Sequence, residues 1–137
     1  MRIANSTTGL VWLTVLVLGH LIATFLHGAA HMGAHVATTP LQSAFILSVI
    51  EIGPVAGLAL ALRRPTAGAW VIALTMAGAL VFGILNHFVI PGADRVDAVS
   101  GPWRGSFAAS AGVLAVIEAA GAAAGALYAM RRMERSS

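Results

Sequence analysis

Four long apolar segments dominate the chain and leave few folds open to it. A bilayer core of about 30 Å requires about 20 apolar residues in one helix, and each segment is long enough. With 58% hydrophobic and 9% charged residues, the composition excludes a water-soluble globular domain. The sequence therefore predicts one all-α integral membrane domain over residues 1–137, a four-transmembrane-helix bundle. The expected helices cover about residues 9–37, 41–62, 66–90 and 106–130, with an outer loop at 91–105.

Charged residues at the ends of these segments predict the orientation of the bundle. Six of the eight arginines lie near the termini or in the turn between the second and third segments. The outer loop carries only Arg95 and Arg104, partly offset by Asp94 and Asp97. Because positive residues concentrate on the cytoplasmic side, we expect both termini in the cytoplasm. The expected location is a plasma membrane of the prokaryotic type, and the lipid bilayer is the first expected partner.

The second and fourth segments share a pattern that indicates an internal repeat. Each contains the motif Val-Ile-Glu, which ends at Glu51 in one and at Glu118 in the other. An arginine pair begins 12 residues after Glu51, at Arg63, and 13 residues after Glu118, at Arg131. We interpret the chain as two helical hairpins in parallel repeat, related by a pseudo-two-fold axis along the membrane normal. The alternative is a chance likeness between helices rich in Ala, Gly and Leu.

Histidines form a stripe along the first segment. His20, His27, His31 and His35 are separated by 7, 4 and 4 residues. At about 100° per residue, these positions share one face of a helix. Ionisable groups at membrane depth are costly and usually face the interior of a bundle, so this stripe is a candidate functional site.

Three further polar residues lie at similar depth on the other segments. They are Glu51, His87 and Glu118, one on each segment. Side chains lean toward the N-terminus of their own helix, so those of the oppositely directed helices converge. We therefore expect the stripe and these residues to meet in the outer half of the bundle.

Imidazole and carboxylate groups together favour a transition metal. The chain has no Cys, so His and carboxylate must supply the ligands. One hypothesis is a di-metal centre, with iron as the expected metal. Another is haem b, held by His87 and by His27 or His31 as axial ligands. The expected metal ligands are His27, His31, His87, Glu51 and Glu118, with His20, His35 and Asn86 as supporting residues or a proton path.

Redox chemistry or electron transfer, as in a membrane oxidoreductase, is the function that this ligand set favours. Two other functions are compatible with it. Glu51 and Glu118 would also suit a proton- or cation-coupled transporter or channel. In a non-catalytic accessory subunit, the same groups would pair only as polar contacts between helices. Small residues on the helices would permit a homodimer, an electron or proton donor is an expected partner, and no motif indicates nucleic-acid binding.

Weaker signals concern the loop and the helix ends. Asp94 and Asp97 are expected to be solvated rather than to recruit a cation. Asn86 is expected either to orient the neighbouring imidazole or to bond to an adjacent helix. Pro54, one turn from Glu51, is expected to kink the second segment and to free a backbone carbonyl.

Overall fold

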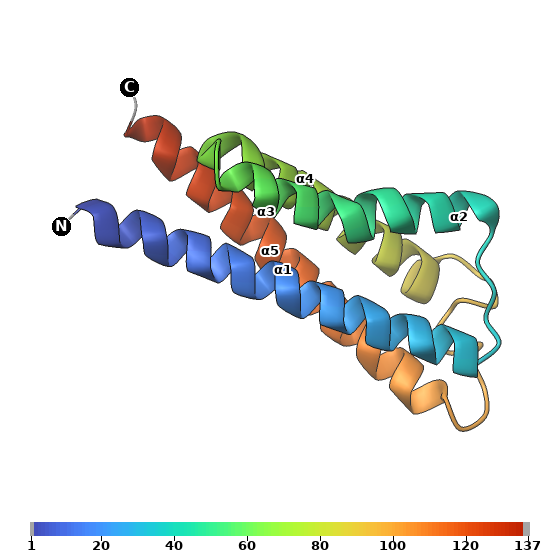
Figure 1. The fold of residues 1–137 in the computed structure, drawn as a ribbon. Helices are drawn as coiled ribbons and strands as arrows, with labels where there is room; N and C mark the ends of the chain where they lie inside the picture. Colours follow the sequence, from blue (N-terminus) through green and yellow to red (C-terminus); the bar gives the residue numbers. More distant parts are fainter. Residues whose placement is uncertain (1, 136–137) are drawn as a thin grey trace.

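The computed structural model describes residues 2–135, with side chains from residue 7, and contains no strand in that range (Figure 1). The first span is α1 (Arg2–Gly33). The second joins α2 (Pro40–Phe45), the π-helical segment η1 (Ile46–Ile52) and α3 (Gly53–Ala61). The third joins α4 (Pro65–Ile84) and the π-helical segment η2 (Leu85–Val89), and the fourth is α5 (Arg104–Glu134).

Within the described range, four helical spans are long and apolar enough to cross a membrane. Their outer surfaces are apolar too, since Ile22, Phe25 and Leu26 are all largely exposed. Such side chains need no protein cover when lipid surrounds them. The predicted all-α class is confirmed within this range, and the four spans have the length and apolar composition expected of a multi-pass membrane protein. Of the predicted domain, Met1, Ser136 and Ser137 lie outside the described residues.

The first helix is shorter than predicted at its C-terminal end. We expected it to reach residue 37, but α1 ends at Gly33. His35 has a φ of 56°, in the left-handed region, and this conformation ends helices. The Val36 amide donates to the carbonyl of His31 at 3.0 Å and closes the last turn.

The second and third spans begin where the sequence predicts a break. Thr39 caps α2, because its hydroxyl accepts from the Gln42 amide at 3.2 Å while the Gln42 side chain accepts from the Thr39 amide at 2.8 Å. Pro40 and Pro65 each occupy a first helical turn, where a missing amide hydrogen costs nothing.

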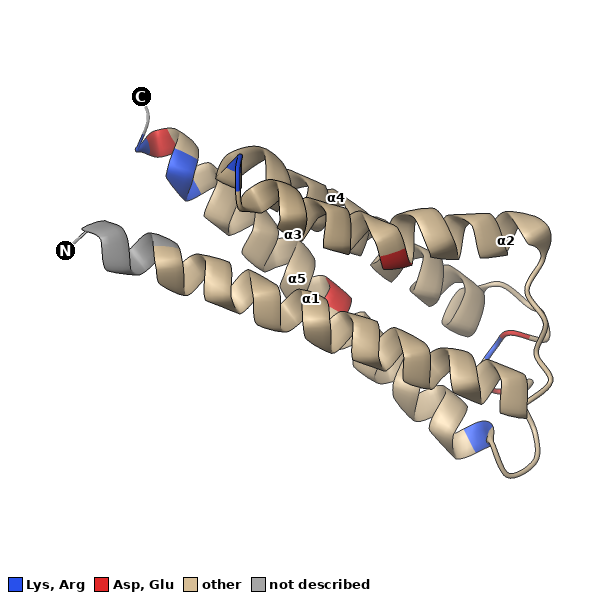
Figure 2. Ribbon diagram, viewed as in Figure 1, with Lys and Arg blue, Asp and Glu red and all other residues tan. Residues whose placement is uncertain are grey.

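Both termini lie at one end of the bundle, and the loop of residues 90–103 lies at the other (Figure 1). We call these ends the terminal half and the loop half. The helix α5 packs against α1 and α4, and α4 packs against α3. Figure 1 shows that α1 and α2 lie well apart in the loop half, although residues 34–39 join them. Charged residues gather at the two ends, with a glutamate in each of two spans as the exceptions (Figure 2).

The terminal half contains a tightly packed apolar core. Leu13, Val17, Ile72 and Met76 are fully buried there. Glycine allows the backbones to approach, since a Cβ atom on Gly125 would lie 2.8 Å from the Ala69 carbonyl oxygen and 3.0 Å from the Ala73 amide nitrogen. Gly121 and Gly125 of the fourth span therefore serve packing within the bundle, whereas Gly112 faces open space.

Candidate metal centre

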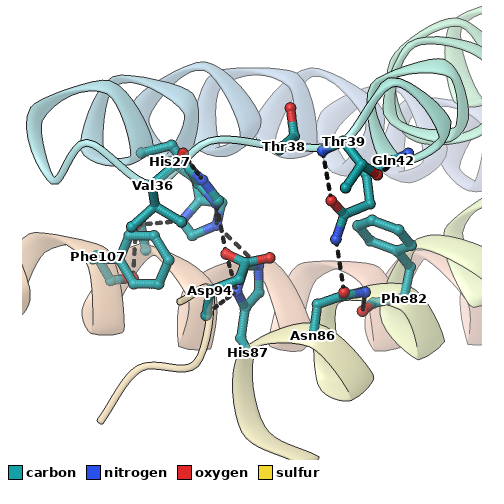
Figure 3. A network of polar contacts seen from close by, with 12 residues as sticks. His27, Val36, Thr38, Thr39, Gln42, Phe82, Asn86, His87, Asp94 and Phe107 are labelled. Carbon is teal, nitrogen blue, oxygen red and sulfur yellow. Dashed lines mark hydrogen bonds and ion pairs between the residues drawn. The ribbon is translucent and has the colours of Figure 1, made fainter. Parts of the chain in front are cut away.

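Three of the predicted histidines meet in the loop half of the bundle. His27 and His31 lie one turn apart on α1, and His87 lies on η2. The Nε2 atom of His27 is 3.1 Å from Nε2 of His87 and 3.2 Å from Nε2 of His31. The three rings offer ligand atoms that all lie within 4.8 Å of one another. We call these three residues the histidine triad, and Figure 3 labels two of them, His27 and His87.

The partners of two triad residues determine which ring nitrogen carries the proton. Nδ1 of His31 lies 3.2 Å from the carbonyl oxygen of Val36, and Nδ1 of His87 lies 3.0 Å from that of Asp94. A carbonyl oxygen only accepts hydrogen bonds, so both Nδ1 atoms donate. The Nε2 atoms of the neutral rings therefore present lone pairs.

The same assignment holds for His27 through a serine on α5. Nδ1 of His27 lies 2.8 Å from Oγ of Ser110, whose hydroxyl donates to the Ser106 carbonyl oxygen at 2.7 Å. The Ser110 oxygen is thus left to accept from His27. In the neutral triad, three Nε2 lone pairs then face one another and repel unless they share a cation. A tetrahedral ion with metal–nitrogen distances of about 2.0–2.1 Å separates its ligands by about 3.3 Å, close to the observed spacing.

Asp94 corrects the expectation of a solvated outer loop. Its side chain is only 17% exposed, and Oδ1 lies 3.2 Å from Nδ1 of His87 and 3.3 Å from Nε2 of His31. The loop folds back because the Val96 amide donates to the His87 carbonyl oxygen at 2.9 Å. Burial alone would raise the pKa of the Asp94 carboxyl group, but contact with His87 and the charges of the nearby imidazoles lower this pKa below its usual value.

Asp97 in the same loop is exposed, as expected, and pairs with Arg95. The hydrogen bond from Arg95 lowers the pKa of the Asp97 carboxyl group. The two loop carboxylates therefore have different surroundings, and only Asp94 contacts the triad.

Phe107 closes one side of the triad. Its ring is fully buried on α5, and its centroid lies 5.0, 4.8 and 5.4 Å from those of His27, His31 and His87. An aromatic wall of this kind excludes water from that side. Phe107, Ser110 and Asp94 were missed from the sequence, because no local spacing links them to the histidines.

The other side of the triad opens into a cavity of about 670 Å³. Glu51, Glu118 and His35 also line it. Most of the predicted site residues therefore line this cavity, although they do not all lie close enough together to bind one ion.

The two predicted glutamate ligands lie apart from the triad cluster. Oε1 of Glu118 lies 3.3 Å from Nε2 of His20, and both side chains are buried. The direct packing of α5 on α1 places His20 beside this carboxylate. Glu51 lies half-buried on η1, and its side chain has no hydrogen bond or ion pair with any residue from 7 to 135.

The two remaining predicted residues lie at the margin. His35 is exposed beyond the end of α1 and does not join the triad cluster. Asn86 accepts from Nε2 of Gln42 at 3.0 Å and donates to the Phe82 carbonyl oxygen at 2.8 Å (Figure 3). It adopts the second expected alternative, a bond to a neighbouring helix.

Both π-helical segments carry a candidate residue, Glu51 in η1 and His87 in η2. Such segments are rare and occur often at functional sites. Pro54 lies in the first turn of α3, just after η1, and lacks an amide hydrogen, whereas the freed carbonyl stays a prediction from the sequence.

Three imidazoles beside a carboxylate form a donor set that suits iron, copper, nickel or zinc. Because Phe107 covers one side only, an ion held by the triad would keep coordination positions open toward the cavity. Comparisons of the chain with protein-family models, curated proteins and solved structures find no match.

Proposed function

We propose that the protein is a small integral membrane metalloprotein that holds a transition-metal ion in the histidine triad and uses it for redox chemistry or electron transfer. The observation that carries this proposal is the direction of the rings. Each Nδ1 atom faces an acceptor, so in the neutral rings the three Nε2 lone pairs face one another, and Oδ1 of Asp94 adds a further acceptor 3.3 Å from Nε2 of His31. In an accessory subunit with polar contacts only, donors would face acceptors. Three converging acceptors instead favour a bound cation.

The geometry favours one ion over the larger cofactors predicted from the sequence. Haem b would require a porphyrin between its axial nitrogens, whereas Nε2 of His27 and Nε2 of His87 lie 3.1 Å apart. Neither Glu51 nor Glu118 belongs to the cluster of ligand atoms that the triad forms, which favours one ion over a di-metal centre. Iron remains our first proposal for the ion, and metal analysis will discriminate it from copper, nickel and zinc.

The transport alternative must explain how a cation would cross the terminal half. The buried polar groups extend from the triad to Glu118 and His20. Beyond His20 on α1 lie Val17 and Leu13, both fully buried in the apolar core. A carrier would have to open this core. Cation flux into proteoliposomes that Glu51→Gln and Glu118→Gln abolish would favour transport over the proposal.

We also propose that both termini are cytoplasmic, which places the triad in the outer half of the membrane. The clustering of arginines near the termini supports this orientation. The parallel repeat of two hairpins, the homodimer and the prokaryotic-type plasma membrane stay predictions from the sequence.

The absence of Cys makes this orientation directly testable. A membrane-impermeant maleimide should label Ala98→Cys in intact cells, and it should label Ala67→Cys only after the membrane is permeabilised. Both residues are exposed, so accessibility to the reagent alone distinguishes them. The reverse pattern would overturn the orientation.

The metal proposal is tested by elemental analysis and by the visible spectrum of protein loaded with cobalt(II). We expect one ion per chain in the purified protein and a loss of at least 100-fold in cobalt affinity for His87→Ala. The matched control is His35→Asn, because His35 lies outside the triad and Asn tolerates its positive φ. A wild-type protein without stoichiometric metal, or equal losses in both variants, would sink the proposal.

A further inference from the structure

The cavity beside the triad has a mouth that faces lipid. Met32 on α1 and Leu47 on η1 both line it, and they are 75% and 55% exposed. Both residues belong to membrane spans. The cavity therefore opens between the first and second spans, which stand apart in this half of the bundle (Figure 1), and also beside the exposed His35 and Thr38 in the connection between these spans. A ligand can enter this cavity from the hydrocarbon of the bilayer.

The size and the apolar part of the lining suit a small lipophilic molecule. The volume of about 670 Å³ falls within the range of about 300–1,000 Å³ that is typical of small-molecule sites. Ile46, Ile50, Phe82 and Leu114 supply apolar surface to the cavity. A ligand with an apolar body would be matched by these side chains.

The charges of the lining define the polar part of the ligand. Glu51, Asp94 and Glu118 line the cavity, and no arginine does so among the described residues. Three carboxylates disfavour a phospholipid headgroup or a fatty acid, since both are anionic. A carboxylate only accepts hydrogen bonds, so a ligand group that contacts Glu51 must donate one, as a hydroxyl group does. The lining therefore disfavours an anionic ligand, and a hydroxyl group on the ligand would match the Glu51 carboxylate.

Polar groups lie on two sides of the cavity, the triad on α1 and η2 and Glu51 on η1. A ligand with a short rigid core and a hydroxyl group at each end would contact the polar groups on both sides of the cavity. We propose that the cavity binds a lipid-soluble hydroquinone, with one hydroxyl group donating to Glu51 and the other facing the open side of the triad. The second contact rests on the proposed function, because it needs the ion in the triad.

The probe for this test is a tritiated decyl-benzohydroquinone, kept reduced and added to the full chain in nanodiscs. Its dimethyl ether lacks the hydroxyl donors, and decanoate carries an anionic head. We expect the hydroquinone to bind at least tenfold more tightly than either competitor. Glu51→Gln, which keeps the side-chain volume, should weaken binding about tenfold.

Two glycines of α1 provide matched variants for blocking the cavity. Gly28 lines the cavity, and a Cβ atom there meets nothing within 4 Å, so Gly28→Phe fills it without a clash at the backbone. Gly19 is equally open but does not line it, so Gly19→Phe is the control. Gly28→Phe should weaken hydroquinone binding at least tenfold, whereas Gly19→Phe should leave it unchanged. A size-exclusion profile that matches that of the wild type shows that each variant is folded.

The outcomes separate the two proposals. If cobalt binds but the hydroquinone binds no better than its dimethyl ether, the hydroquinone inference fails and the metal proposal stands. If cobalt does not bind while the effects of Glu51→Gln and Gly28→Phe appear, the metal proposal fails and the cavity assignment stands. If Gly28→Phe leaves hydroquinone binding unchanged, the hydroquinone does not bind in this cavity and the inference is wrong.

Discussion

Leu13 and Ile72 in the terminal half pack where the helices approach closely, whereas His27 and His87 in the loop half lie where the same bundle opens around a cavity. Both halves are built from helices of similar apolar composition. In the terminal half, glycine lets helix backbones approach closely, whereas the loop half contains two π-helical segments and a folded-back loop. The terminal half therefore contains the packing that stabilises the bundle, and the loop half contains the candidate metal centre.

The largest expected effect comes from filling a close contact in the terminal half. Gly125→Leu forces a side chain against the backbone of α4, so we expect loss of the folded bundle, beyond the usual cost of about 1–3 kcal/mol for overpacking. Gly28→Leu in the loop half projects into open space and should leave the thermal unfolding midpoint nearly unchanged. Size-exclusion profiles and thermal unfolding in detergent measure both. Equal unfolding midpoints for the two variants would show that the two halves do not differ in how tightly they are packed.

A smaller effect is expected from a residue that only orients a triad ring. Ser110→Ala removes the acceptor at Nδ1 of His27, so the ring is no longer held with Nε2 toward its neighbours. Losses of this kind typically reduce metal affinity about 10–100-fold. The control is Ser48→Ala on η1, whose hydroxyl donates only to the Ala44 carbonyl oxygen at 2.7 Å. Cobalt titrations that fail to separate Ser110→Ala from this control would contradict the assigned role.

The smallest effect concerns the loop that closes the site, measured on metal-free protein. The pKa of Asp94 lies below its usual value of 3.8, so its contact with the imidazoles stabilises the fold above that pH. We expect Asp94→Asn to cost about 1 kcal/mol at neutral pH. This difference should vanish as the pH falls through the lowered pKa of Asp94, where both proteins carry a neutral side chain.

Asp97→Asn is the matched control in the same loop. Asp97 is exposed and contacts Arg95 rather than the triad, and an exposed ion pair contributes little to stability, so its substitution should shift the unfolding midpoint much less than Asp94→Asn does. A midpoint difference for Asp94→Asn that persists at acid pH would show that the loop is held by packing alone.

Hydropathy predicted the four spans because lipid-facing helices must be apolar along their length. Thr39 and Pro40 predicted the start of α2, because Thr caps a helix and Pro suits its first turn. The triad was predictable in part, since His27 and His31 share a helix face by their spacing. Depth comparisons along straight helices placed Glu118 with the triad. They did not account for the packing of α5 on α1, which pairs this carboxylate with His20.

The residues missed in the sequence reach the site through tertiary folding. Asp94 depends on a loop that turns back over η2, and Ser110 depends on the rotation of α5 relative to α1. Neither contact has a signature in residue spacing. The end of α1 at Gly33 was missed for a similar reason, since the positive φ of His35 occurs at a residue type that does not require it.

The π-helical segment η2 sets the direction in which His87 points. A π turn holds about one residue more than an α turn, so it rotates the side chains beyond it by about 100° relative to a continuous α-helix. A homologous chain with one residue fewer between Leu85 and Val89 would keep its hydropathy, its spans and every histidine. Its imidazole would nevertheless turn away from α1. Segment length at this point is therefore a better marker of the site in related chains than the presence of the histidine itself.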